Sequence, residues 1–318
     1  MNQTRRQFVR TLFVASQAAA IGSFLPKSLM ALPLDHDALP FLVVGDWGRR
    51  GEERQVDVAR QMGLEAEALR ARFVASVGDN FYEDGVASTT DPQWFDSFEN
   101  IYTAESLQVP WHSVLGNHDY HASCEAQIDY SKTSKRWKMP ARFFKRTESV
   151  GPGCEADLMF LDTTPMAEAG DDTQVLGNEL KSQNVPAQLE WLEASLSESK
   201  ARWKIVFAHH PVFSGGVHGD TPFIVDHVLP LLEKYGVQAY FNGHDHDLQH
   251  LQAGGVNFFC SGAGSKVRET SDIRFTKFAK GSTSGFLSAV LKPDEMALRM
   301  VDWKGRVLYT CKVPATPV

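Results

Sequence analysis

Short apolar runs alternate with helically spaced stretches along most of the chain. The apolar runs are four to six residues long and end in polar clusters, as strands buried in a sheet do. These predicted strands cover residues 40–44, 73–77, 111–115, 158–161, 203–208, 237–241 and 256–260. Helical spacing of apolar residues predicts helices over 52–72, 186–199 and 223–235. The β-α-β alternation predicts an α/β fold, in one domain over 38–318.

The pattern changes near the C-terminus. Residues 286–291, 297–301 and 307–312 are predicted strands, and a turn around Lys304-Gly305 joins the last two. Such a meander adds antiparallel strands, so the fold is expected to be mixed. Two segments, 120–156 and 166–185, are expected to form long loops over the strand ends.

Side chains able to bind a metal follow five of the predicted strands. They are Asp46, Asp79, Asn117 with His118, His209 with His210, and His244 with His246. In α/β sheets, sites form beyond the carboxyl ends of strands, so these groups are expected to share one crevice. Each alone has an ordinary explanation, because Gly-Asp often forms a turn and adjacent histidines can be a hydrogen-bonded core pair. Their recurrence at five strand ends favours a metal site.

The types of donor narrow the choice of metal. Carboxylate and amide oxygens mixed with imidazoles suit first-row transition metals better than calcium or magnesium. No cysteine lies at these strand ends, which argues against a structural thiolate zinc site. Cys124 and Cys154 flank the 120–156 segment and could pair in an oxidising compartment. Cys260 lies in an apolar run and is expected to be a buried free thiol.

Composition and charge exclude several classes of protein. Of the 318 residues, 43% are hydrophobic, which excludes a disordered chain. The formal net charge is −7, and the first 31 residues hold four basic side chains and no acid, so the remainder is more acidic still. An acidic body argues against nucleic acid as a partner. No run of 18 apolar residues follows the N-terminus, so no stable membrane span is expected.

Residues 1–31 have the plan of an export signal. Arg5 and Arg6 precede Gln-Phe-Val, and a mildly apolar run over 12–25 leads to small residues near Ala31. The arginine pair resembles the bacterial twin-arginine signal, which predicts the twin-arginine export machinery as a partner. The expected location is therefore the bacterial periplasm or the exterior. An amphipathic start helix or a membrane anchor is the alternative.

Five sequence blocks together resemble the purple acid phosphatases, in their small tartrate-resistant type, among the calcineurin-like metallophosphoesterases. The blocks are Gly45-Asp46-Trp47-Gly48, Gly78-Asp79-Asn80-Phe81-Tyr82, Gly116-Asn117-His118-Asp119, Val206-Phe207-Ala208-His209 and Gly243-His244-Asp245-His246. The likeness covers about residues 40–313. It implies a four-layer α/β/β/α sandwich with metal ligands at the carboxyl ends of the strands.

The resemblance also implies a site for two metals. Asp46, Tyr82 and His246 would hold a ferric ion, Asn117, His209 and His244 a divalent iron, zinc or manganese ion, and Asp79 would bridge the two. Tyr82 is the decisive position, because a phenolate is a hard, charged ligand that suits ferric iron. Protein Ser/Thr phosphatases of the superfamily have no tyrosine there.

Further histidines match residues that surround the metals in the family. His118 and His218 are the implied catalytic residues, which would donate a hydrogen bond to phosphate or protonate the leaving alkoxide. His210 is expected to line the substrate pocket, and Asn117 to contact substrate as well. The implied activity is that of a monomeric acid phosphatase, which hydrolyses small phosphate monoesters with a metal-activated hydroxide. The alternatives are a phosphodiesterase or nucleotidase, and an exported iron-binding redox protein with little hydrolysis.

Overall fold

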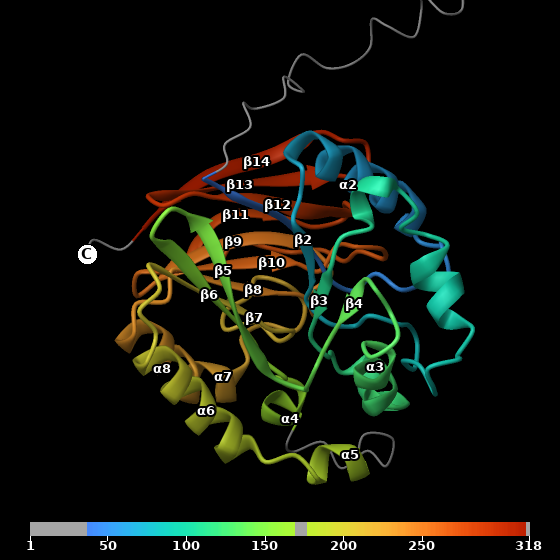
Figure 1. Ribbon diagram of the computed structural model, residues 1–318, viewed down its shortest axis with the longest axis horizontal. Helices are drawn as coiled ribbons and strands as arrows, with labels where there is room; N and C mark the ends of the chain where they lie inside the picture. Colours follow the sequence, from blue (N-terminus) through green and yellow to red (C-terminus); the bar gives the residue numbers. More distant parts are fainter. Residues whose placement is uncertain (1–36, 169–176, 316–318) are drawn as a thin grey trace, which may run out of the picture. The chain divides into compact units, whose positions relative to one another are not determined.

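Two seven-stranded mixed sheets form the body of the protein (Figure 1). The structure, a computed structural model, describes residues 37–168 and 177–315, and the predicted export signal lies outside these ranges. The strands are β1 (Leu39–Val44), β2 (Phe73–Ser76), β3 (Trp111–Ser113), β4 (Trp137–Lys138), β5 (Phe144–Gly151), β6 (Cys154–Phe160), β7 (Trp203–Phe207), β8 (Ala239–Asn242), β9 (Leu248–Ala253), β10 (Val256–Ser261), β11 (Thr276–Lys280), β12 (Gly285–Leu291), β13 (Glu295–Asp302) and β14 (Val307–Pro314).

Each sheet has a parallel centre and antiparallel neighbours. The first sheet has the order β14-β13-β12-β1-β2-β3-β4, with β1 to β4 parallel and the predicted C-terminal meander joined to β1 through β12. The second has the order β11-β9-β10-β8-β7-β6-β5, in which β6, β7, β8 and β10 are parallel. Parallel strands of one sheet share the edge at which they end, so the sheets place several strand ends together.

Aromatic side chains fill the space between the sheets. Rings in neighbouring strands of the second sheet stack in a row, with centroids 4.6 to 5.2 Å apart, through Phe144, Phe160, Phe207, Phe241 and Phe259. Phe41 of the first sheet meets the edges of Phe207 and Phe241 at 6.1 and 6.0 Å. Side chains alternate between the faces of a strand, so these rings belong to the inner face and pack the two sheets together.

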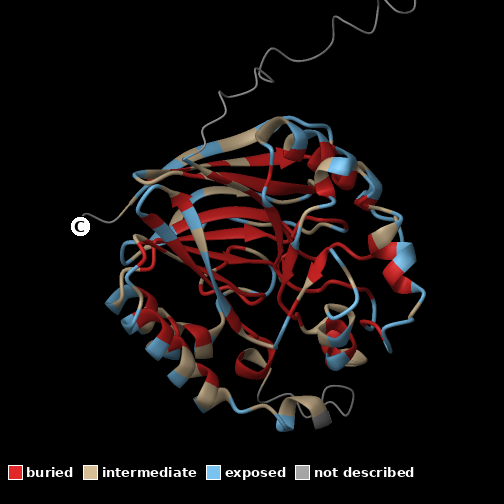
Figure 2. Ribbon diagram, in the orientation of Figure 1, coloured by how far each residue is buried: buried red, intermediate tan, exposed pale blue. Residues whose placement is uncertain are grey.

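Helices cover the outer faces of both sheets. They are α2 (Gln55–Leu69), α3 (Cys124–Tyr130), α4 (Thr164–Ala167), α5 (Gly177–Lys181), α6 (Val185–Ser197), α7 (Pro222–His227) and α8 (Leu229–Lys234). Helix α2 contacts β1 and β12, while α6, α7 and α8 pack apolar residues onto the second sheet. The strands are largely buried and the helices half-exposed (Figure 2). The predicted α/β/β/α sandwich is therefore confirmed.

Several predictions about individual segments are wrong. Residues 120–156 are not one long loop, because α3, β4, β5 and the start of β6 lie within them. The helix predicted over 223–235 is two helices, since Pro230 lacks the N–H that a continuous helix needs and instead lies in the first turn of α8, which begins at Leu229. Strands β9 and β11 were not predicted. Cys124 and Cys154 are both buried free thiols, so the disulfide considered for them does not form.

Candidate metal centre

The predicted ligands come from strand ends of both sheets and lie together. Asp46 follows β1, Asp79 follows β2, Asn117 lies beyond β3, His209 follows β7, and His244 with His246 follows β8. Three of them have left-handed backbones, with φ of 60° at Asp46, 50° at Asp79 and 68° at His244. Residues other than glycine rarely adopt this backbone conformation, and such backbone strain is concentrated at functional sites.

Two glycines beside these ligands are needed for the close approach of the chain segments. A Cβ at Gly116 would overlap the carboxylate of Asp79, and a Cβ at Gly243 would overlap that of Asp46. Both glycines directly precede a predicted ligand. The Gly-Asn and Gly-His pairs are therefore packing requirements of the site.

The first group of donors converges on the phenol oxygen of Tyr82. This oxygen lies 3.0 Å from Asp46 Oδ1, 2.8 Å from Asp79 Oδ2 and 3.1 Å from His246 Nε2. All four side chains are buried. The arrangement matches the set Asp46, Tyr82 and His246 that the resemblance assigns to one metal.

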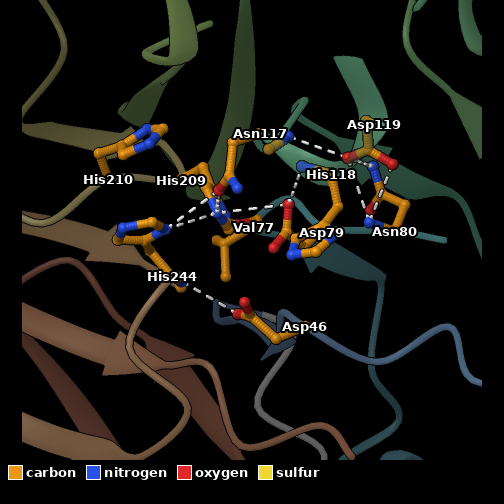
Figure 3. A network of polar contacts seen from close by, with 12 residues as sticks. Asp46, Val77, Asp79, Asn80, Asn117, His118, Asp119, His209, His210 and His244 are labelled. Atoms are coloured by element: carbon orange, nitrogen blue, oxygen red, sulfur yellow. Dashed lines mark hydrogen bonds and ion pairs between the residues drawn. The ribbon is translucent and has the colours of Figure 1, made fainter. Parts of the chain in front are cut away.

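The second group of donors surrounds the amide oxygen of Asn117 (Figure 3). This oxygen lies 3.2 Å from His209 Nε2 and 3.1 Å from His244 Nδ1, and the two imidazole nitrogens are 3.3 Å apart. Asp79 Oδ1 is 3.5 Å from His209 Nε2, while Asp79 Oδ2 accepts from Tyr82. Asp79 therefore touches both groups, as a bridging ligand must.

Hydrogen bonding fixes which nitrogen of His209 faces the centre as an acceptor. His209 Nδ1 lies 2.9 Å from the backbone carbonyl of Val77, to which it can only donate. When the ring is neutral, Nε2 then carries a lone pair, and it faces the Asn117 oxygen and the nitrogen of His244. Burial lowers the pKa of His209 to about 4 and that of His246 to about 3, and it also holds the pKa of His244 well below its ordinary value. Converging acceptors without protons are suited to binding a cation.

The pKa values of the oxygen donors at this centre are also shifted from their ordinary values. Burial, and then the charge of Asp79, raise the pKa of Asp46. Burial and the two carboxylates raise the pKa of Tyr82. Burial would also raise the pKa of Asp79, but the charges of His209 and His118 outweigh it and hold that pKa at about 2. A metal ion would favour the ionised forms of all three groups, so these residues fit a site for metal ions.

A buried network that sequence reasoning missed supports two of the ligand loops. The carboxylate of Asp119 accepts backbone N–H groups of Gly116 at 2.9 Å and Asn80 at 3.1 Å, and the side-chain N–H of Gln127 at 2.8 Å. Burial and nearby Asp79 raise the pKa of Asp119 to about 7. The signal was present in the Gly-Asn-His-Asp block, whose last residue ties the loop of Asn117 to that of Asp79.

The predicted outer histidines also lie at this centre. His118 Nδ1 is 2.5 Å from the carbonyl of Glu83, and its ring lies 4.5 Å from that of Tyr82. The exposed ring of His218 lies 4.2 Å from that of His244, a predicted ligand. The structure therefore brings both predicted catalytic residues next to the donor groups.

His210 lies at the same centre but is buried. Its ring is 4.5 Å from that of His244, and its Nδ1 is 3.0 Å from the hydroxyl of Thr163. The same hydroxyl accepts the backbone N–H groups of His209 and His210. One ring nitrogen of His210 also lies close to ligand atoms of His209 and His244. His210 therefore borders the site, as predicted for a residue that lines the pocket.

Two arginines near the centre were not singled out from the sequence. The guanidinium of Arg49 lies 3.6 Å from the centre of the Tyr82 ring and pairs with Glu83 at 2.5 Å. Arg268 Nη1 lies 2.5 Å from His218 Nε2. Neither arginine occupies a patterned strand end, so nothing in the spacing distinguished them from surface charges.

Comparisons with known proteins decide the family. The Calcineurin-like phosphoesterase family model matches residues 39–248. Purple acid phosphatase 17 of Arabidopsis thaliana is 41% identical over 288 residues, which cover 86% of this chain and 83% of the relative. Tartrate-resistant acid phosphatase type 5 of Oryctolagus cuniculus is 35% identical, with 90% and 94% covered. The chain belongs to the purple acid phosphatases.

Solved structures agree on the fold of this purple acid phosphatase. Purple acid phosphatase PPD1 from yellow lupin (Lupinus luteus) seeds has a TM-score of 0.62 at 16% identity, with 86% of this chain and 53% of that chain covered. GAP50 of Plasmodium, an anchor in the inner membrane complex, has a TM-score of 0.78 at 24% identity, with 88% and 90% covered. These likenesses concern the fold alone.

Membership of this family explains why the site has two groups of metal donors. Purple acid phosphatases are phosphoester hydrolases with a dinuclear metal centre that contains iron, and this chain supplies two adjoining groups of buried and half-buried donors that share Asp79. Within the described residues, no helix is both long enough and apolar enough to cross a bilayer.

Proposed function

We propose that the protein is an acid phosphatase that hydrolyses small phosphate monoesters at an Fe(III)–M(II) centre, where M is iron, zinc or manganese. The observation that carries the proposal is the pair of donor groups joined by Asp79, with the Tyr82 oxygen at the centre of one group. The geometry supports the proposal because one group is rich in anionic oxygen and the other in imidazole.

We assign the ligands by the group in which each lies. Asp46, Tyr82 and His246 would hold the ferric ion, Asn117, His209 and His244 would hold the divalent ion, and Asp79 would contact both. When bound, the metal pair supplies an acidified water as nucleophile and offsets the charge of the phosphoryl group, which favours a mildly acidic optimum.

Side chains around the donor groups bind and orient the substrate in this proposal. His218 and the amide of Asn117 donate hydrogen bonds to substrate oxygens, and His210 forms part of the pocket wall. His118 Nδ1 donates to the Glu83 carbonyl, so the orientation of its ring is fixed toward the site. Partial burial lowers the pKa of His218, with the charge of Arg268 acting in the same direction and that of Asp245 against it, so the neutral ring is favoured.

The decisive experiment combines metal analysis, a visible spectrum and substrate comparison on the purified protein. The proposal requires two metals per chain, a tyrosinate–ferric colour, and faster hydrolysis of p-nitrophenyl phosphate than of bis(p-nitrophenyl) phosphate. A preference for the bis-ester would instead indicate a phosphodiesterase. Iron and colour without turnover would indicate a redox or storage role, and a colourless protein containing zinc alone would refute the Tyr82 assignment.

We further propose that the chain is exported by the twin-arginine machinery and acts as a monomer. The support is the Arg5-Arg6 signal plan, since a pathway that carries folded proteins suits a chain that must acquire metals first. Replacing both arginines by lysine should retain the protein in the cytoplasm, as fractionation would show. Light scattering on the exported protein tests the oligomeric state.

A further inference from the structure

An arginine without an acidic partner lies beside the proposed catalytic histidine. Arg268 is half-buried, and among the ion pairs of the described residues none involves it. Among the described residues, the one hydrogen-bond partner of its guanidinium is the Nε2 atom of His218, at 2.5 Å. A guanidinium has five N–H donors, so most of them are available to a ligand.

The position of Arg268 is fixed by its own backbone. Its N–H donates to the carbonyl of His246 at 3.0 Å, and its carbonyl accepts the N–H of Ser282 at 2.8 Å. The first bond ties Arg268 to the loop of a predicted ligand. The side chain therefore starts from a defined point at the rim of the metal centre.

Backbone hydrogen bonds also fix the position of His218. The N–H of His218 donates to Asp245 Oδ1 at 3.0 Å. The N–H of Ser271, three residues after Arg268, donates to the carbonyl of Gly215 at 3.0 Å, and the Ser271 hydroxyl donates to the same carbonyl at 3.2 Å. These bonds join the two loops, so the His218–Arg268 pair is organised before substrate arrives.

Hydrogen bonding also defines the donors that the pair presents. A guanidinium can only donate, so His218 Nε2 accepts and the ring carries its proton on Nδ1. The pair thus offers an imidazole N–H next to several guanidinium N–H groups. Adjacent donors of this kind suit two oxygens of one tetrahedral phosphate, which a guanidinium binds in bidentate fashion.

We propose that Arg268 is a specificity-determining residue that binds a second phosphoryl group on the leaving side, so that phosphoanhydrides are favoured over simple monoesters. The inference rests on the proposed function, since it assigns a substrate class to the same site. His218 donates to the bridging oxygen, and Arg268 donates to non-bridging oxygens on the second phosphorus.

The reaction on such a substrate balances with water alone. The oxygen of water bonds to the attacked phosphorus, and the bond from that phosphorus to the bridging oxygen breaks. The bridging oxygen keeps the electron pair and leaves as part of the second phosphate, while the protons of water pass to the products or to solvent. A phosphate departs without first being protonated, which suits a neutral imidazole donor at His218.

The test uses the full metal-loaded protein and the substitution Arg268→Gln. We expect kcat/KM for inorganic pyrophosphate to fall by about 10- to 100-fold more than that for p-nitrophenyl phosphate, the range for a lost charged hydrogen bond. Most of the loss should appear in KM. Arg268→Lys, which keeps the charge but not the planar fork, should give an intermediate loss.

A binding measurement separates this role from a merely structural one. Calorimetry should show that Arg268→Gln weakens methylenebisphosphonate by the same factor while methylphosphonate changes much less. Arg274→Gln removes an exposed charge from the same β10–β11 connection and should change neither ligand. Metal content should equal that of the unmutated protein in both variants.

Two results would overturn the inference while leaving the phosphatase in place. They are an equal loss for pyrophosphate and p-nitrophenyl phosphate, and an unchanged affinity for methylenebisphosphonate. Failure of the proposed function looks different, because the unmutated metal-loaded protein would then hydrolyse neither substrate.

Discussion

The carboxylate of Asp245 accepts the backbone N–H of His218 at 3.0 Å, across 27 positions of sequence. Asp245 lies between two predicted ligands, His244 and His246, so one loop both provides donors and fixes the loop of a proposed catalytic residue. The hydroxyl of Ser214 donates to the other oxygen of the same carboxylate. The loop that carries the predicted ligands His244 and His246 therefore also fixes the position of His218.

Substitution of Ser214 by alanine should loosen this loop without emptying the centre. The hydroxyl also accepts the side-chain N–H of Gln249 at 2.9 Å and the backbone N–H of Gly216 at 3.0 Å, so its removal takes one hydrogen bond from each of these groups and one from the buried carboxylate of Asp245. Such a loss costs about 1–3 kcal/mol, and a misplaced His218 should lower kcat/KM about tenfold or more. Steady-state kinetics and metal analysis check this, with exposed Ser197→Ala as the control. Loss of metal in Ser214→Ala would contradict it.

Replacing Asp79 by alanine should remove both metals together with turnover. Its carboxylate reaches Tyr82 on one side and His209 on the other, so no other residue compensates for both contacts. Metal analysis of Asp79→Ala should fall from two ions per chain toward none. Asp157→Asn changes a buried carboxylate of β6 that belongs to neither donor group, and it should keep both ions. Retention of one tightly held ion in Asp79→Ala would show that the groups bind independently.

Substitution of Tyr82 by phenylalanine should abolish the colour while the fold is preserved. The ring would still pack under the guanidinium of Arg49, so the contact at 3.6 Å survives and only the phenol oxygen is lost. We expect the visible band to disappear and iron affinity to fall by about 10- to 100-fold, as for other changes around metal ligands. Tyr120→Phe removes another buried phenol, which donates to Asp162, and should keep the band. A persistent band in Tyr82→Phe would exclude Tyr82 as the ligand.

The strand ends were predictable because their chemistry is local. An apolar run followed by Gly-Asp or Gly-His marks both the strand and the residue that leaves it, and parallel strands necessarily bring such residues to a common edge. The order of the strands was not predictable in this way. It depends on pairings such as β1 with β12, in which residues far apart in the chain meet and no local pattern is involved.

Other features escaped prediction for physical reasons of their own. The 120–156 segment folds into short elements whose burial comes from tertiary contacts, for example Trp137 donating to the carbonyl of Gln127 at 3.0 Å. Periodicity over such short spans is weak. The role of Tyr82 came from the family resemblance, because a tyrosine in a turn has no spacing that identifies it. Arg268 lies in an irregular connection, where only the structure shows its contact with His218.

Stability at acidic pH offers a test that is independent of catalysis. His112 of β3 is buried between the rings of Phe73 and Phe160, and its Nδ1 has no hydrogen-bond partner within residues 37–168 and 177–315. Burial, reinforced by the charges of Arg146 and Lys138, lowers its pKa to about 3. The unfolded chain takes up this proton near pH 6.5 and the folded chain does not, so stability falls as pH drops from about 6.5 toward 3.

Replacing His112 by leucine should remove that pH-dependent loss. At pH 5 the unfolded imidazole is mostly charged, so the effect amounts to about 2 kcal/mol relative to pH 8. Denaturant unfolding of both proteins at the two pH values isolates it, because metal release contributes equally to each and cancels in the difference. His227→Gln, at an exposed imidazole of α7, should leave the pH dependence unchanged. If His112→Leu loses as much stability between pH 8 and pH 5 as the unmutated protein, the buried imidazole is not the group that limits acid stability.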